Sequence, residues 1–150
     1  MTITFVYFFL AAMLGHFVGD YVLQNQWMAL NKSKKGWKYN IPCFIHVALY
    51  TLAIHFFTHG YLQPEKQELS LIAVFAPHYI IDRTSLANYI LRLKNGYSLE
   101  DTVVKIPSAS HKAGLVQDMW KIAFAAPVYI MNDNTLHFVC LWFTVKWFFS

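Results

Sequence analysis

Four long apolar runs place the strongest constraint on how this chain folds. A helix needs about 20 mostly apolar residues to cross the hydrocarbon core of a bilayer, and runs of about that length or longer occupy residues 3–24, 41–58, 69–93 and 122–149. Only 13% of the residues are charged, whereas a soluble domain has about 25%. The sequence therefore predicts an all-α integral membrane protein and argues against a soluble enzyme or a disordered chain.

The predicted architecture is a four-transmembrane-helix bundle that forms a single membrane domain over residues 1–150. Pro42 suits the first turn of the second helix, where its missing N–H does no harm. Asn95 and Gly96 are typical of a helix C-terminus and are expected to end the third helix. The last apolar region begins near residue 115 and exceeds one span. We therefore expect a short interfacial helix over residues 115–121 before the fourth span.

Lysine and arginine are concentrated in the loops after the first and third predicted spans. Because cytoplasmic loops are enriched in these residues, both termini are predicted to lie outside, and the expected location is the bacterial inner (cytoplasmic) membrane. The bilayer is the expected partner, a homo-oligomer remains open, and no nucleic acid is expected because the aromatic residues lie inside apolar runs. The first-loop lysines are interpreted as a topology signal that also contacts anionic lipid. They are Lys32, Lys34, Lys35 and Lys38.

Histidines and aspartates recur four residues apart inside the predicted spans, a spacing that places them on one face of a helix. A carboxylate at the bilayer centre costs about 2.5–3.5 kcal/mol, so these side chains must face one another, a cation or water. We predict that they line one interior cavity and hold a metal. The predicted ligands are His16, Asp20, His46, His78, Asp82, Asp133 and His137.

Imidazole and carboxylate donors suit a divalent metal such as zinc, manganese or iron, and helical bundles build such sites from inward-facing carboxylates and histidines. Asp20 and Asp133 are the candidate catalytic bases. Gln24 and Asn134 are candidates for orienting a ligand or the substrate. The alternative for each histidine–aspartate pair is a hydrogen bond between helices without a metal. The remaining histidines are interpreted as interfacial (His55, His59) or solvated in the third loop (His111).

The motif around Asp20 also carries a resemblance to a known family. The run GHFVGDYVLQ at residues 15–24, followed by Trp-Met-Ala at 27–29 and a lysine, resembles the start of a bacterial and phage family of small membrane proteins called domain of unknown function 3307. The resemblance continues at His46 and at His78 with Asp82, and it ends at residues 133–137, where Asn134 replaces a glutamine. It implies a small membrane protein and no particular activity.

Three functions are compatible with these features. The first is a membrane-embedded metal-dependent hydrolase of a lipid or lipid-linked substrate, in which the metal activates water or polarises an acyl or phosphoryl oxygen. A looser similarity to bacterial membrane-bound metal-dependent hydrolases points the same way. The second is an ion, proton or small-solute transporter or channel, since such proteins use intramembrane histidines and aspartates. The third is a non-enzymatic membrane effector or partner-binding protein, for example in phage infection or defence.

Overall fold

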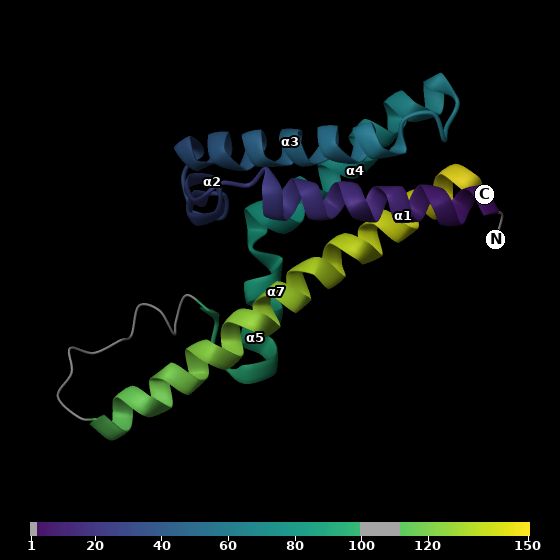
Figure 1. Ribbon diagram of the computed structural model, residues 1–150. Coiled ribbons are helices and arrows are strands. Elements are labelled where there is room, and N and C mark those ends of the chain that lie inside the picture. The colour runs from purple at the N-terminus through teal and green to yellow at the C-terminus, as the bar shows by residue number, and fades with distance from the viewer. Residues whose placement is uncertain (1–2, 100–111) are drawn as a thin grey trace. The chain divides into compact units, whose positions relative to one another are not determined.

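The computed structural model describes residues 3–99 and 112–150, and only the backbone for 112–118. The described residues form helices and connecting turns, with no strand among them, as the predicted all-α class requires (Figure 1). They divide into two compact units, Met1–Thr84 with His137–Ser150, and Ser85–Leu136. The elements in chain order are α1 (Ile3–Phe17), the π-helical turn η1 (Val18–Val22), α2 (Gln26–Asn31), the 3-10 turn η2 (Trp37–Tyr39), α3 (Asn40–Thr58), α4 (Pro64–Thr84), α5 (Leu86–Asn95) and α7 (Lys112–Phe149).

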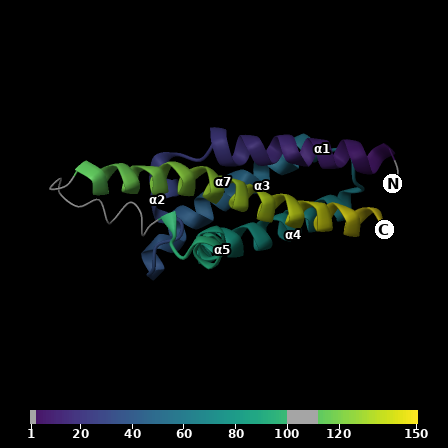
Figure 2. The same ribbon diagram turned by 90° about the horizontal axis from the view of Figure 1, so that it is seen from below.

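Two glycines bring α1 and η1 into direct backbone contact with α3. A Cβ atom on Gly15 would lie 2.6 Å from the Cα atom of Ile54, and one on Gly19 would lie 2.9 Å from the Cα atom of Tyr50. This spacing of four is the small-xxx-small pattern that lets helices in membranes approach closely. The helices run side by side and antiparallel (Figures 1 and 2). The close approach places His16, next to Gly15, beside the ring of Tyr50.

Helix α4 also packs along α3, and the C-terminal part of α7 completes the first unit. Pro77 lies inside α4 and removes the hydrogen bond that the carbonyl of Ala73 would accept. Thr144 of α7 supplies a replacement, since its Oγ1 donates to that carbonyl at 3.4 Å. At one end of the unit, Phe5 of α1 meets Phe149 of α7 edge to face, so both termini lie at the same end (Figure 2).

The segment between η1 and α3 was predicted as a polar loop but is ordered by specific contacts. Asn25 caps α2 by accepting a hydrogen bond from the backbone N–H of Met28 at 3.0 Å, and the Met28 side chain is buried. The guanidinium of Arg83 donates to the carbonyls of Lys34 and Gly36 and to Oδ1 of Asn40. The end of α4 therefore fixes the chain from α2 to the start of α3.

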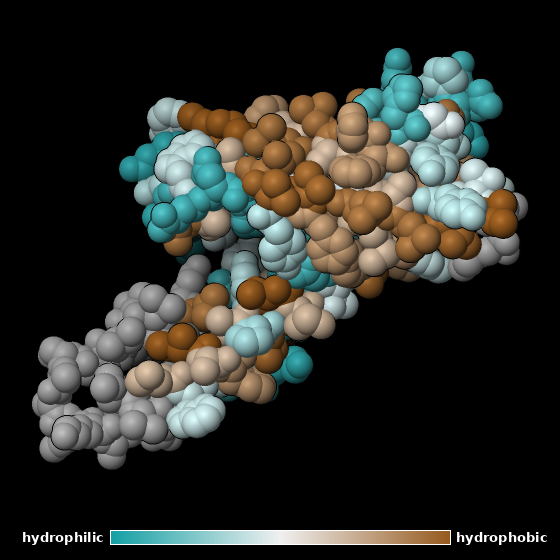
Figure 3. Space-filling model, viewed as in Figure 1, coloured by the Kyte–Doolittle hydropathy of each residue, from teal (hydrophilic) through white to brown (hydrophobic). Residues whose placement is uncertain are grey.

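The outer surface of the first unit is apolar along the middle of its helices. Figure 3 shows hydrophobic residues gathered over the middle of α1 and α3, and hydrophilic residues at both ends of α3. Residues 3–22 and 37–58 are long and apolar enough to cross a membrane, which favours membrane association. The other two predicted spans are not supported by composition, because α4 includes Glu65, Glu68 and Arg83 and α7 includes a polar stretch at residues 132–134.

Two predicted boundaries are wrong. The third helix, predicted as one span over 69–93, begins at Pro64 and is interrupted at Ser85, which adopts a left-handed conformation (φ 52°, ψ 44°) between α4 and α5. Neither a proline nor a glycine lies at the break, so the residues that usually mark the end of a helix did not predict it. The separate interfacial helix at 115–121 is absent, since α7 runs without interruption from Lys112 to Phe149.

The second unit contains α5 and the first part of α7. Helix α5 ends as predicted, because Gly96 takes a left-handed conformation (φ 76°) and its N–H bonds to the carbonyl of Arg92 at 2.8 Å. Asn88 links both ends of this helix: its amide donates to Ser85 Oγ, and its Oδ1 accepts from the N–H of Leu99.

The glycine contact between α1 and α3 leads to a stability prediction. We expect Gly15→Val to lower the free energy of unfolding by about 1–3 kcal/mol, because the added side chain overlaps backbone atoms of α3 that have no room to move aside. Thermal melting of the detergent-purified protein measures the effect. Leu14→Val is the control, since Leu14 is 56% exposed. Equal melting temperatures for both variants would contradict the packing described here.

The contacts of Arg83 lead to a prediction about the α2–α3 connection. Arg83→Gln removes the donors that hold the carbonyls of Lys34 and Gly36, so trypsin should cleave after Lys34, Lys35 and Lys38 at least several-fold faster than in the wild type. Mass spectrometry of the early fragments reports the sites. Arg92→Gln on α5 is the matched control, and a cleavage rate unchanged by Arg83→Gln would show that this clamp does not order the segment.

Candidate functional site

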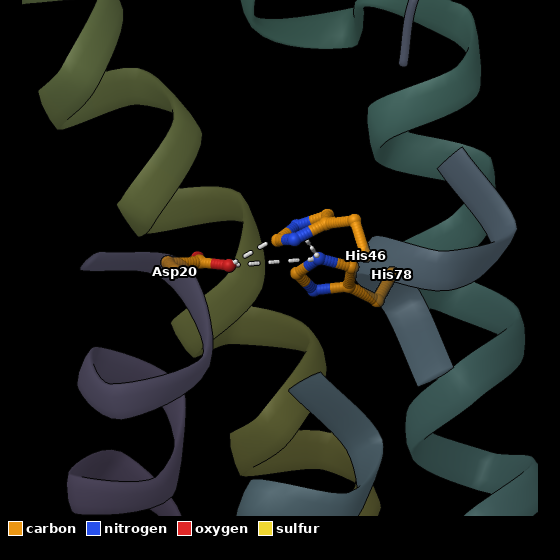
Figure 4. A group of neighbouring side chains, drawn as sticks. All are labelled: Asp20, His46 and His78. Atoms are coloured by element: carbon orange, nitrogen blue, oxygen red, sulfur yellow. Dashed lines mark hydrogen bonds and ion pairs between the residues drawn. The ribbon is translucent and has the colours of Figure 1, made fainter. Parts of the chain in front are cut away.

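Four histidines and two aspartates of the first unit converge between α1, η1, α3, α4 and α7. Each of the four imidazoles and Asp82 is at most 3% exposed, and the Asp20 side chain is 10% exposed. Figure 4 shows three of these side chains pointing toward one another from different elements, Asp20 from η1, His46 from α3 and His78 from α4. The predicted convergence of His16, Asp20, His46, His78, Asp82 and His137 is therefore observed for these six residues.

Local structure explains how each element presents its side chain. Asp20 is the central residue of η1, and single π-helical turns of this kind are frequent at functional sites. His78 and Asp82 are one helical turn apart on the buried face of α4, and Nε2 of His78 lies 3.2 Å from Oδ2 of Asp82. The ring of His137 from α7 lies beside that of His78, with centroids 4.1 Å apart.

The core of the cluster is a triangle of donor atoms from α3 and α4. Nε2 of His46, Nε2 of His78 and Oδ2 of Asp82 lie 3.1, 3.0 and 3.2 Å apart. Oδ1 of Asp20 lies 3.4 Å from the first nitrogen and 3.7 Å from the second. A metal about 2.0–2.2 Å from each donor holds neighbouring donors about 2.9–3.6 Å apart, from octahedral to tetrahedral geometry. All but the longest of these distances fall in that range.

Two overlapping groups of three donors could hold a metal ion. They are Asp20 with His46 and His78, and His78 with Asp82 and His137, and within each group the ligand atoms lie within 4.8 Å of one another. The donor types, imidazole and carboxylate, suit zinc, iron or manganese. The same short distances also permit hydrogen bonds among the rings and carboxylates, which is the metal-free alternative.

The cluster has more acceptor atoms than donors. Among the described residues, Oδ1 of Asp20 and both carboxylate oxygens of Asp82 are buried and receive no hydrogen bond, although cationic or imidazole groups lie at ion-pair distance. Buried acceptors without hydrogen bonds are uncommon in proteins and call for a compensating charge. The arrangement is therefore chemically suited to a cation.

Two residues of the cluster were not predicted. Lys32, interpreted as part of a topology signal that contacts anionic lipid, is buried, and its Nζ lies 3.0 Å from Oδ2 of Asp82. Tyr50 is 1% exposed; its OH lies 3.1 Å from Nδ1 of His16, and its ring lies against that of His78, with centroids 3.6 Å apart and planes tilted by 30°. The spacing of Tyr50 four residues after His46 on α3 was the available signal for its position. Nothing in a lysine-rich segment distinguishes Lys32 from its neighbours.

The other candidate residues have different positions. The amide of Gln24 contacts the ring of His46, with Nε2 3.3 Å from the ring Nε2; its role in orienting a ligand stays a prediction. Asp133 and Asn134 belong to the second unit, so their place in the site stays a prediction. His55 lies away from the cluster, contacts His59 and bonds to Gln67. His111 lies outside the described residues.

Comparison with known proteins identifies the family but not an activity. The profile of a family described as "Protein of unknown function (DUF3307)" matches residues 8–149. Neither a curated protein nor a solved structure matches the chain, so the looser similarity to metal-dependent hydrolases is not shown. The family match covers the whole first-unit cluster and confirms the resemblance carried by residues 15–24. The chain therefore belongs to the DUF3307 family of proteins of unknown function.

Proposed function

We propose that this chain is a membrane protein that binds a divalent metal between its helices and uses it to hydrolyse a lipid or lipid-linked substrate. The observation that carries the proposal is the triangle of His46, His78 and Asp82 donor atoms, with edges of 3.0–3.2 Å and buried carboxylate oxygens that receive no hydrogen bond from the described residues. Such a triangle provides three of the ligands that catalytic zinc sites use.

One metal per chain is the expected stoichiometry. Nε2 of His78 lies 3.7 Å from Oδ1 of Asp20 and 3.2 Å from Oδ2 of Asp82, and one ring nitrogen binds one metal. The two overlapping ligand groups share His78. They therefore offer alternative or combined ligands for the same ion.

Asp20 is our candidate for the general base. Its side chain keeps 10% exposure while the imidazoles around it are at most 2% exposed, so it is better placed than they are to meet water. His16 lies 3.4 Å from its second carboxylate oxygen and is itself held by Tyr50. A divalent metal supplies polarisation of an acyl or phosphoryl oxygen or activation of water. In our proposal Asp20 accepts the proton that the attacking water loses.

Four membrane spans also belong to this proposal, although composition supports two. Helices α1, α3, α4 and the C-terminal part of α7 expose large apolar side chains, while the four histidines and Asp82 of the cluster are buried. Exposed apolar surface of this kind marks contact with a membrane. The most exposed member on each helix of the unit is Ile3 at 73% on α1, Phe56 at 77% on α3, Ile72 at 69% on α4 and Trp147 at 64% on α7.

Reporter fusions test the membrane topology. Because α1 with η1 and α3 run antiparallel, the connection between them and the turn after α3 must lie on opposite sides of the bilayer if both helices span it. A fusion after Lys38 should report the cytoplasm, as the lysine bias predicts, and a fusion after Gly60 should report the outside. The same compartment for both fusions would contradict a spanning α3.

Metal content of ligand variants tests the site. Detergent-purified wild type, equilibrated with zinc, manganese or iron and then washed, should retain about one metal per chain, since a buried imidazole–carboxylate site binds such ions. His46→Ala, His78→Ala and Asp82→Asn should each retain almost none. His55→Ala is the matched control on α3, because His55 bonds to Gln67 away from the cluster. Elemental analysis gives the stoichiometry, and circular dichroism confirms that each variant is folded.

The outcome separates a metal site from a hydrogen-bonded cluster. Full metal retention in the folded His46→Ala and His78→Ala variants, or no metal in the wild type, would contradict the proposed metal site. The hydrolase proposal would then be contradicted as well. The hydrolytic step is tested separately, by incubating metal-loaded protein with a bacterial lipid extract and measuring released head groups and fatty acids by mass spectrometry. Release should cease with chelator, and should fall at least about a hundredfold in Asp20→Asn if Asp20 is the base.

A further inference from the structure

Lys32 pairs with one of the three atoms that the proposed metal would use. Its Nζ lies 3.0 Å from Oδ2 of Asp82, and the same oxygen lies 3.0 Å from Nε2 of His46 and 3.2 Å from Nε2 of His78. We propose that Lys32 regulates the filling of this site: its ammonium holds the carboxylate when no metal is bound, and a metal must displace it. The inference rests on the proposed metal site and concerns how that site is filled.

The distances bring the two cations close together. A metal bound to Oδ2 of Asp82 lies about 2.0–2.2 Å from that oxygen, and the Lys32 ammonium lies 3.0 Å from it. The two cations are then at most about 5 Å apart. The side chains of Lys32 and Asp82 are only 10% and 1% exposed, so water screens their repulsion poorly. The repulsion is relieved when the ammonium leaves the carboxylate.

The choice of carboxylate oxygen favours competition with the metal over support of it. A carboxylate oxygen has about two lone-pair directions, and Oδ2 of Asp82 already faces two imidazole nitrogens as well as the ammonium. A lysine that supports a metal-bound carboxylate is expected at the oxygen that the metal leaves free. Lys32 instead contacts Oδ2, which is a corner of the donor triangle.

The fold allows the Lys32 side chain to move while its backbone stays in place. Lys32 is the C-cap residue of α2, and its N–H bonds to the carbonyl of Met28. Arg83 holds the following residues by donating to the carbonyls of Lys34 and Gly36. A lysine side chain is long enough to turn its charged end toward water while its stem stays packed. Exchange with a metal therefore needs a rotation of one side chain and no rearrangement of the α2–η2 segment.

Zinc affinity of lysine variants tests the inference. Competition with a coloured chelator in detergent should show about tenfold or more tighter zinc binding in Lys32→Met than in the wild type. Even in bulk water, a divalent and a monovalent cation about 5 Å apart repel each other by about that factor. Lys35→Met removes an exposed lysine of the same segment and should match the wild type. Lys32→Arg keeps the positive charge and should stay closer to the wild type than to Lys32→Met.

Amine labelling of the wild type is a second measurement that needs no variant. Zinc should make Lys32 react several-fold faster with an acetylating reagent, because its ammonium leaves the buried carboxylate, and mass spectrometry quantifies the product. Lys35 is exposed and serves as the internal control. Tryptic cleavage after Lys34 and Lys38 should not change with zinc, since Arg83 keeps the segment in place.

The possible outcomes separate this inference from the proposed function. Zinc affinity in Lys32→Met that equals or falls below that of the wild type overturns the displacement and leaves the metal site standing. Unchanged labelling of Lys32 in zinc-loaded wild type overturns it as well. Zinc bound by Lys32→Met and not by the wild type supports the competition and contradicts the proposed function. No zinc in either protein overturns both.

Discussion

The burial of the Asp82 carboxylate is the constraint on which the first unit depends. Three elements meet at its Oδ2 atom: Lys32 after α2, His46 of α3 and His78 of α4, all within 3.2 Å. An ionised carboxylate away from water requires such partners, so the positions of α2, α3 and α4 are linked through this one atom. The glycine contact between α1 and α3 adds Asp20 and His16 to the same centre.

Sequence periodicity predicted the inner face of each helix better than the helix boundaries. The four-residue spacing of His16 with Asp20, and of His78 with Asp82, placed these pairs correctly because a helix repeats its faces at that interval. Lys32 was missed because its position depends on the contact of its Nζ with Asp82 of α4, which is distant in sequence and which no local pattern encodes. The break at Ser85 was missed for a similar reason, since a serine in the left-handed conformation has no strong sequence signal.

Gly15 and Gly19 indicate close packing of α1 and η1 against α3, which is missed when the motif is inspected only for metal-binding residues. The run at residues 15–24 carries the resemblance to the family. Its glycines and its polar residues nevertheless have different structural roles. The glycines bring two backbones together, and His16, Asp20 and Gln24 then reach α3 from the shortened distance. One short motif therefore contains both the glycines that allow close packing and three of the candidate site residues.

The average hydropathy of α4 does not identify it as a membrane span, whereas its exposed face is apolar. This difference has a physical origin. A window average counts every residue on a helix equally, so the inward-facing His78 and Asp82 and the terminal Glu65, Glu68 and Arg83 lower the value for α4. In the proposed four-span arrangement the bilayer would contact only the outer face of α4, where Leu69, Ile72 and Ile80 are at least 50% exposed. Polar residues on the inner face of a helix lower its window average, whatever its outer face contacts. For a protein whose proposed chemistry lies between its helices, the average hydropathy of α4 therefore understates how apolar its outer face is, whereas α1 with η1 passes the test in spite of His16 and Asp20.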